Sequence, residues 1–184
     1  MDEKEYKYKQ ARLMMLSIRY LWFIGNSYIK TVLNLKETQI DNLCSIELLS
    51  SQAVEILLKS YYSSEICFSN KEKDEECLKL IIDKKLRDLS HNLKTLLDYD
   101  IDLKNQLNIL SVQRVSNGFV DDYRLTMKNN SEISFKNLES VRYGVFASKQ
   151  NIINGAFTNE MFLFLENLSR ISHEKIVEVI NKLK

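Results

Sequence analysis

The stretch "SSQAVEILLKSYY", residues 50–62, lies inside the apolar pattern that decides the fold. Between residues 40 and 63, apolar residues recur at steps of three and four, which is the spacing of one face of an α-helix. This face holds Leu43, Ile46, Leu49, Ala53, Ile56 and Leu57, with Ser60 on the same side. The polar face carries Glu47, Glu55 and Lys59. The stretch therefore predicts an amphipathic helix on which Glu55 and Lys59 form a surface ion pair one turn apart.

The rest of the chain continues this helical pattern. Further helices are predicted for residues 4–24, 77–89, 90–97, 102–115 and 158–184. The first helix is expected to end at Gly25-Asn26, since glycine tolerates the left-handed backbone that closes a helix. Ser90 and Thr158 stand at the starts of two later helices, and Ser90 is a candidate N-cap. Residues 119–140 show no clean period, and "KNNSE" within them is typical of a surface turn. No stretch shows sustained two-residue alternation between hairpin turns. The fold class predicted is all-α, an antiparallel helical bundle of five to six helices.

Composition sets limits on the class of protein. The 184 residues suit one domain, and the net charge of +1 gives no dominating attraction to nucleic acid. Three scattered cysteines and two histidines give no metal-binding pattern, so neither a metal nor a cofactor is expected. No apolar run is long enough to cross a membrane, and "MDEKEYKYKQ" is unlike a signal peptide. We expect a cytoplasmic protein that does not contact a membrane.

Three segments together resemble the HEPN superfamily, small helical domains of prokaryotic stress, toxin–antitoxin and defence systems. The stretch 50–62 resembles the second helix of the family, and "HNLKTLLDY" (91–99) resembles its His-x-Leu-x-x-Leu-Leu segment. "LESVRYGVF" (138–146) is similar to its Arg-Tyr-Pro stretch, with Gly144 in place of proline. The resemblance divides a single domain, residues 1–184, into an N-terminal helical extension (1–39) and a HEPN-like bundle (40–184).

The ribonuclease motif of this family is missing from the chain. In HEPN ribonucleases, a histidine follows an arginine after four to six residues, and the pair supplies a base and a cation. The positions after Arg142 hold Ala147, Ser148 and Lys149 instead. The resemblance therefore implies a non-catalytic module in a bacterial stress or defence system. Its ligand would be a nucleotide, an RNA or a partner protein such as a nucleotidyltransferase or an antitoxin.

Four residues are candidates for ligand contacts: Arg142, Tyr143, Lys59 and His91. A guanidinium beside a phenol can hold a phosphate and stack a base. Three of the four also have a plainer role: Lys59 in its pair with Glu55, His91 at a helix end, and Arg142 in a salt bridge.

Two alternatives stay open, and a homodimer is expected in any case. One is a metal-independent endoribonuclease toxin with a displaced pair; the other is a helical protein-interaction scaffold. The displaced pair would be Arg142 or Arg87 with His91, or Arg170 with His173. The homodimer is implied by the resemblance, since members of the family commonly pair through their helices, and by the run "FTNEMFLFL", residues 157–165, whose apolar surface exceeds one narrow stripe. Its residues are Phe157, Met161, Phe162 and Phe164.

Overall fold

A computed structural model describes residues 3–35, 39–89, 92–116, 121–136 and 158–184 of the chain. The helices are α1 (Glu3–Leu35), α2 (Gln39–Ser69), α3 (Glu75–Leu89), α4 (Leu93–Asp98), α5 (Ile101–Gln106) and α8 (Asn159–Lys182). The strands are β1 (Ile109–Ser116), β2 (Asp121–Met127) and β3 (Glu132–Lys136). The described chain is thus mostly helical, as predicted, but it is not all-α.

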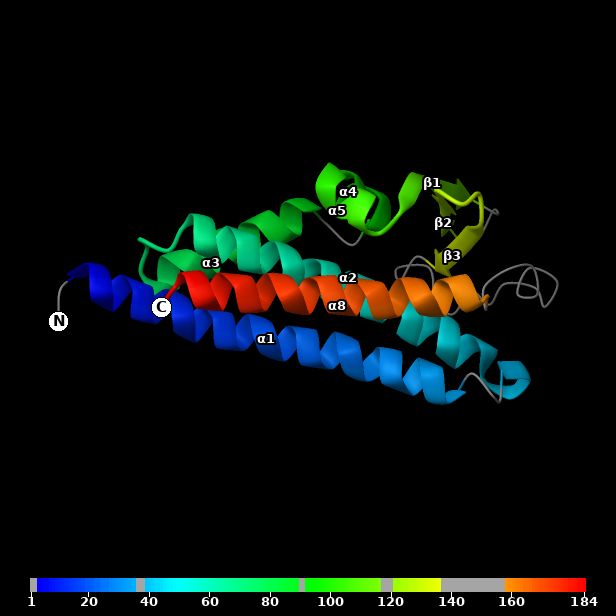
Figure 1. The fold of residues 1–184 in the computed structure, drawn as a ribbon, viewed down its shortest axis with the longest axis horizontal. Helices are drawn as coiled ribbons and strands as arrows, with labels where there is room; N and C mark the ends of the chain where they lie inside the picture. The colour runs from blue at the N-terminus through cyan, green and yellow to red at the C-terminus, as the bar shows by residue number, and fades with distance from the viewer. Residues whose placement is uncertain (1–2, 36–38, 90–91, 117–120, 137–157) are drawn as a thin grey trace.

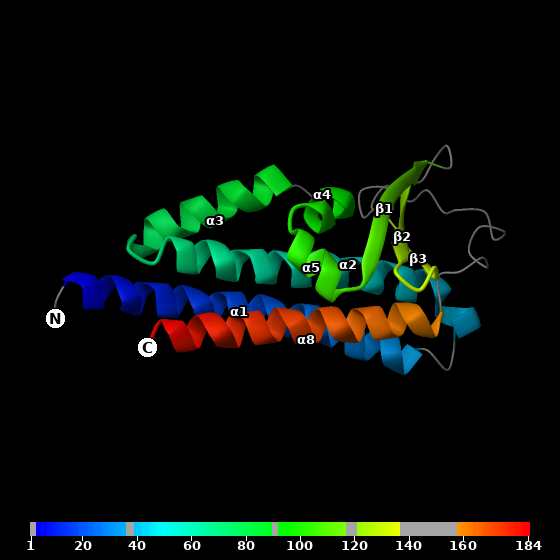
Figure 2. The ribbon, with the colours of Figure 1, turned by 45° about the horizontal axis from the view of Figure 1, so that its top comes forward.

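Three long helices form the body of the molecule. Figure 1 and Figure 2 show α1, α2 and α8 side by side along the long axis, with α2 and α8 running opposite to α1. Their inner faces supply much of one core, in which Val32, Leu57 and Leu165 are fully buried. A second core lies toward the chain ends, where Met15 of α1 packs with residues of α2, α3 and α8. The guanidinium of Arg12 donates to the carbonyls of Leu183 and Lys184 there.

The predicted end of the first helix at Gly25 is wrong. Helix α1 continues for ten residues beyond Gly25, to Leu35. Gly25 is buried in the helix, and a β-carbon built on it would lie 2.9 Å from Cγ of Leu57 in α2. The glycine therefore permits a close approach of two helices instead of ending one.

The helix predicted over residues 102–115 is also wrong beyond its first turns. After α5, the chain enters an antiparallel sheet with strand order β1-β2-β3. In the register, Tyr123 pairs with Phe135 and Leu125 with Ile133, and these four side chains are buried. The "KNNSE" segment does form a turn, between β2 and β3, with Asn130 in the left-handed conformation at φ 64°.

The short helices are attached to α2 by tyrosines. Asn92 caps α4 through bonds from the main-chain N–H groups of Lys94 and Thr95 to its side-chain oxygen, while the candidate cap Ser90 lies outside the described residues. The hydroxyl of Tyr62 in α2 donates to the carbonyl of Leu96, and that of Tyr61 lies 3.3 Å from Asp100. The prediction that the last helix starts at Thr158 is confirmed, since its hydroxyl caps α8. None of the described helices combines the length and apolarity needed to span a membrane.

Candidate functional site

A polar stripe runs along α2 on residues four positions apart. Its members are Glu47, Ser51, Glu55 and Lys59, and the name "α2 stripe" refers to these four below. The stripe is largely shielded from solvent, because Ser51 and Glu55 are buried and the side chains of Glu47 and Lys59 are only 13% and 20% exposed. Buried polar groups of this kind cost stability unless they are paired, so their contacts show what the stripe does.

The predicted pair of Glu55 and Lys59 is confirmed, but not as a surface pair. The Nζ of Lys59 lies 2.6 Å from Oε1 of Glu55, and the two side chains are 20% and 8% exposed. At this depth, losing one partner would leave a poorly hydrated charge. Lys59 is therefore a structural partner of Glu55 in addition to being a candidate for ligand contact.

The other half of the α2 stripe meets the sheet through Lys136. The Nζ of Lys136 lies 3.0 Å from Asp122, its register partner in β2, and 4.0 Å from Glu47. The main-chain N–H of Lys136 donates to Oγ of Ser51 at 3.0 Å. The last residue of β3 is thus fixed to α2 through both its backbone and its ammonium group.

Among these residues, negative charge exceeds positive charge by one. Glu47, Glu55 and Asp122 face two ammonium groups, those of Lys59 and Lys136. Burial raises the pKa of the Glu47 carboxyl above its ordinary value of 4.5; Lys136 opposes the rise and Asp122 adds to it. The cluster can hold a sheet on a helix, and both of its lysines already have carboxylate partners.

The displaced pair on α8 has other partners. Arg170 donates to both carboxylate oxygens of Glu174, at 2.8 and 3.0 Å, and to Asn167. The ring of His173 stacks on Trp22 of α1 with 4.5 Å between centroids. These contacts favour a structural role for both residues.

The remaining candidates divide between the described and the undescribed parts of the chain. Arg87 is exposed and donates to the carbonyl of Asp83 one turn earlier in α3. His91, Arg142 and Tyr143 lie outside the described residues. Of the predicted site, the structure therefore tests only the geometry around Lys59, Arg87, Arg170 and His173.

The apolar run offered for a homodimer is mostly internal. Met161, Phe162 and Phe164 are each at most 3% exposed, because they face the core between α8, α2 and the sheet. Phe157 lies outside the described residues, and among the described apolar residues of this run only Leu163 is exposed. The homodimer stays a prediction for light scattering, without these residues as its basis.

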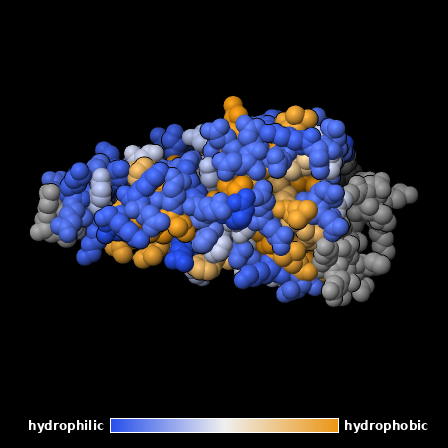
Figure 3. Space-filling model, in the orientation of Figure 1, coloured by the Kyte–Doolittle hydropathy of each residue, from blue (hydrophilic) through white to orange (hydrophobic). Residues whose placement is uncertain are grey.

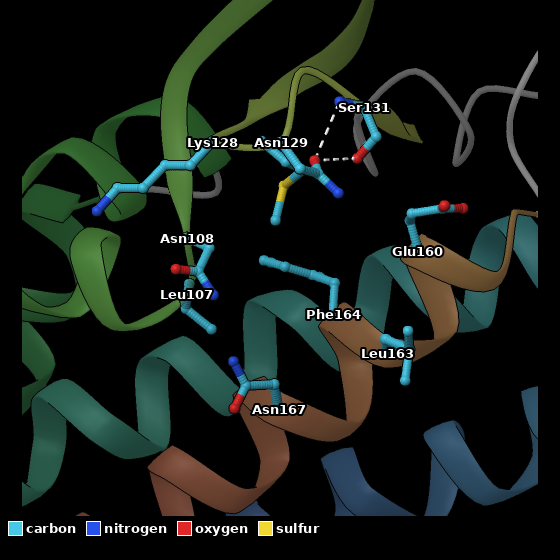
Figure 4. A pocket seen from close by; sticks show the side chains of 10 residues that line it. Leu107, Asn108, Lys128, Asn129, Ser131, Glu160, Leu163, Phe164 and Asn167 are labelled. Atoms are coloured by element: carbon cyan, nitrogen blue, oxygen red, sulfur yellow. Dashed lines mark hydrogen bonds between the residues drawn. The ribbon is translucent and has the colours of Figure 1, made fainter.

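Sequence reasoning missed a cavity of about 430 Å³ between α8, the β2–β3 turn and the start of β1. Figure 4 shows Phe164 pointing toward the middle of the cavity, with the amide side chains of Asn108, Asn129 and Asn167 around it. Met127 also lines the cavity, and Figure 3 shows apolar surface over the N-terminal half of α8. The size is typical of small-molecule sites. Its polar groups are largely engaged, however: Asn129 accepts from Ser131 within the turn, and Asn167 donates to the carbonyl of Gln106.

Within the described residues, no three His, Cys, Asp or Glu side chains gather closely enough to hold a metal ion. Comparison with protein-family models, with curated proteins and with solved structures gives no match to this chain.

Proposed function

We propose that this chain is a non-catalytic HEPN-like module that binds a nucleotide or an RNA phosphate through Arg142 and Tyr143. The observation that supports it most is the α2 stripe, on which the Glu55–Lys59 pair of the HEPN-like helix is buried and internally paired. Such a stripe is a rigid support in which carboxylates outnumber ammonium groups. The contacts to an anionic ligand would then come from another cation, and Arg142 is the candidate.

The chain between Lys136 and Arg142 is long enough for Arg142 to reach the α2 stripe. Lys136, which is bonded to Ser51, precedes Arg142 by six residues, and six extended residues span at most about 20 Å. The α2 stripe from Ser51 to Lys59 is only about 12 Å long at the rise of an α-helix. A guanidinium that reaches it can either neutralise the excess carboxylate or grip a phosphate in two places.

A catalytic role is not proposed, because the histidine that supplies the base in HEPN ribonucleases is missing from its expected place. The positions after Arg142 lack histidine, and one positioned acid–base group accounts for roughly 10²–10⁴-fold in rate. The described pair, Arg170 and His173, is engaged by Glu174 and Trp22.

The test is a titration with labelled RNA and with ATP at low salt. Arg142→Ala should abolish measurable binding with little change in melting temperature, and Arg142→Lys should restore part of it, because lysine lacks the planar fork. Arg124→Ala is the matched control, since Arg124 is a half-exposed arginine 3.8 Å from Glu132 in the hairpin. Equal affinities for all four proteins would reject the proposal.

A cleavage assay distinguishes the module from the toxin. The purified protein in metal-free buffer should leave RNA intact. Robust cleavage that disappears in His91→Ala or His173→Ala protein would replace the proposal with the endoribonuclease.

A further inference from the structure

Helix α1 carries two apolar stripes on opposite sides. The inner one packs into the cores and contains Ala11, Met15, Ile18, Ile29 and Val32. The outer one contains Tyr6, Leu13, Leu16, Tyr20 and Phe23, and is called the outer stripe below. Helices on the surface of a globular protein normally have one apolar face, so the outer stripe is not explained by packing among the residues that the structure describes.

The outer stripe has the geometry of a helix–helix seam. Tyr6, Leu13 and Tyr20 are seven residues apart, and so are Leu16 and Phe23, which gives the repeat of positions a and d in a coiled coil. Each of the five side chains is between 45% and 67% exposed. A stripe of this width is narrow compared with the broad apolar face by which amphipathic helices lie in a lipid surface.

The first turn of α1 holds two acidic residues, Glu3 and Glu5, and beyond it the charged residues of this helix are all basic. From Tyr6 to Leu35, α1 contains five basic residues and no acidic one. Lys9 lies within the stripe by helical position, and Arg12, Arg19 and Lys30 follow one edge of it. Arg12 is turned to the carbonyls at the chain end and Lys7 to Glu3. The guanidinium of Arg19 lies over the ring of Phe23, 5.6 Å from its centroid.

A second copy of the chain does not fit this charge pattern well. If two outer stripes packed antiparallel with Leu16 against Tyr20, the same edges would meet, and Arg19 would face Arg19 of the other copy. Like charges across such a seam are unfavourable, and edge charges are what select the partner and its orientation. A partner with carboxylates at the edge would meet the basic row with opposite charge.

We propose that the outer stripe docks one amphipathic helix of a partner protein, apolar at its a and d positions and acidic along its edges. This interaction goes beyond the proposed function, since it uses a different surface and requires neither Arg142 nor a nucleotide.

The probe is a synthetic three-heptad peptide with Leu at a and d and Glu at e and g, labelled for fluorescence anisotropy. A second peptide has Lys in place of every Glu. The acidic peptide should bind the wild-type protein, more weakly as salt rises, and the basic peptide should not. Leu16→Gln should weaken binding about tenfold, which corresponds to about 1.4 kcal/mol. Arg19→Glu should weaken binding of the acidic peptide and allow the basic peptide to bind.

The matched control is Leu80→Gln in α3, where Leu80 is 67% exposed, compared with 57% for Leu16. Both variants should keep the wild-type melting temperature, and Leu80→Gln should keep the affinity. No binding of the acidic peptide by folded protein, or equal losses in both variants, would overturn the proposal. A dimer in light scattering that Leu16→Gln abolishes would also overturn it and would assign the outer stripe to a second copy of the chain. Binding to vesicles containing phosphatidylglycerol that Leu16→Gln abolishes would overturn it too and would assign the stripe to a membrane.

Discussion

Replacing Gly25 by alanine tests the packing of α1 on α2, because local propensity and tertiary contact predict opposite signs. Alanine is favoured over glycine by about 1 kcal/mol in the interior of a helix. In the structure, however, the new methyl group would lie 2.9 and 3.0 Å from Cγ and Cδ2 of Leu57 and 3.3 Å from Cγ2 of Ile56. Overpacking of a well-packed core costs typically 1–3 kcal/mol. Taking about 2 kcal/mol for the contact leaves a net loss of about 1 kcal/mol.

For a chain of this length, that loss lowers the melting temperature by about 2–4 °C. The assay is thermal unfolding followed by circular dichroism, with Ser17→Ala as the control, since Ser17 is an exposed position of the same helix. The control should change the melting temperature little or raise it slightly. In Gly25→Ala protein, Leu57→Val should cost less than in the wild type, because the shorter side chain relieves the contact. A Gly25→Ala protein that melts at or above the wild type would refute the close approach.

Three further outcomes follow from buried groups. Because burial raises the pKa of Glu47, the protonated carboxyl contributes to stability below pH 4.5, and this contribution is lost as the pH rises through the raised pKa. Glu47→Gln protein should therefore resist urea better than the wild type at pH 7 and equally well near pH 4, as measured by urea unfolding. Lys136→Met should lower the free energy of unfolding by about 2 kcal/mol in the same assay, because it breaks the mostly buried pair with Asp122. Lys182→Met, which removes a half-exposed pair with Glu178, should lower it by under about 0.5 kcal/mol, and equal losses would show that the Lys136–Asp122 pair is not buried. Burial raises the pKa of the Cys67 thiol to about 12, so iodoacetamide at pH 8 should label Cys77 well before Cys67, as read by mass spectrometry; equal labelling would contradict the burial.

The long helices could be predicted because their apolar residues repeat without interruption. Helices α2, α3 and α8 appear close to the predicted segments, and Thr158 marks the start of α8. The error at Gly25 arose because a glycine at a helix end and a glycine at a helix contact look alike in one sequence. Only the neighbour, Leu57 in α2, distinguishes the two, and it is a tertiary contact.

The sheet could have been found from its second and third strands. Tyr123, Leu125 and Met127 alternate with polar residues, as do Ile133 and Phe135 after the turn. Strand β1 does not show this alternation. Leu103, Leu107 and Leu110 have helical spacing, and an irregularity in register between Ile109 and Ser111 breaks the two-residue alternation that a strand would otherwise show.

The site was partly accessible to the same reasoning. The Glu55–Lys59 pair follows from spacing alone, but its burial does not, since that depends on what the rest of the chain lays against α2. The contact of Lys136 with Asp122 would have followed from a hairpin centred on "KNNSE", as the two are register partners. That Glu47 and Ser51 complete the cluster could not be read from the sequence, because it requires the position of the sheet on α2.

The α2 stripe and the outer stripe of α1, on which the two proposals rest, both depart from the usual distribution of polar and apolar residues. Along α2, charged side chains lie inside the molecule, and along α1, leucines and aromatic rings lie outside it. A buried polar residue or a connected exposed apolar patch is more informative than a residue in its expected place, because each costs stability that the fold alone does not recover. The α2 stripe recovers part of this cost through its ion pairs with Lys59 and Lys136. The outer stripe of α1 has no such compensation among the residues that the structure describes, and a partner helix with acidic edges would supply it.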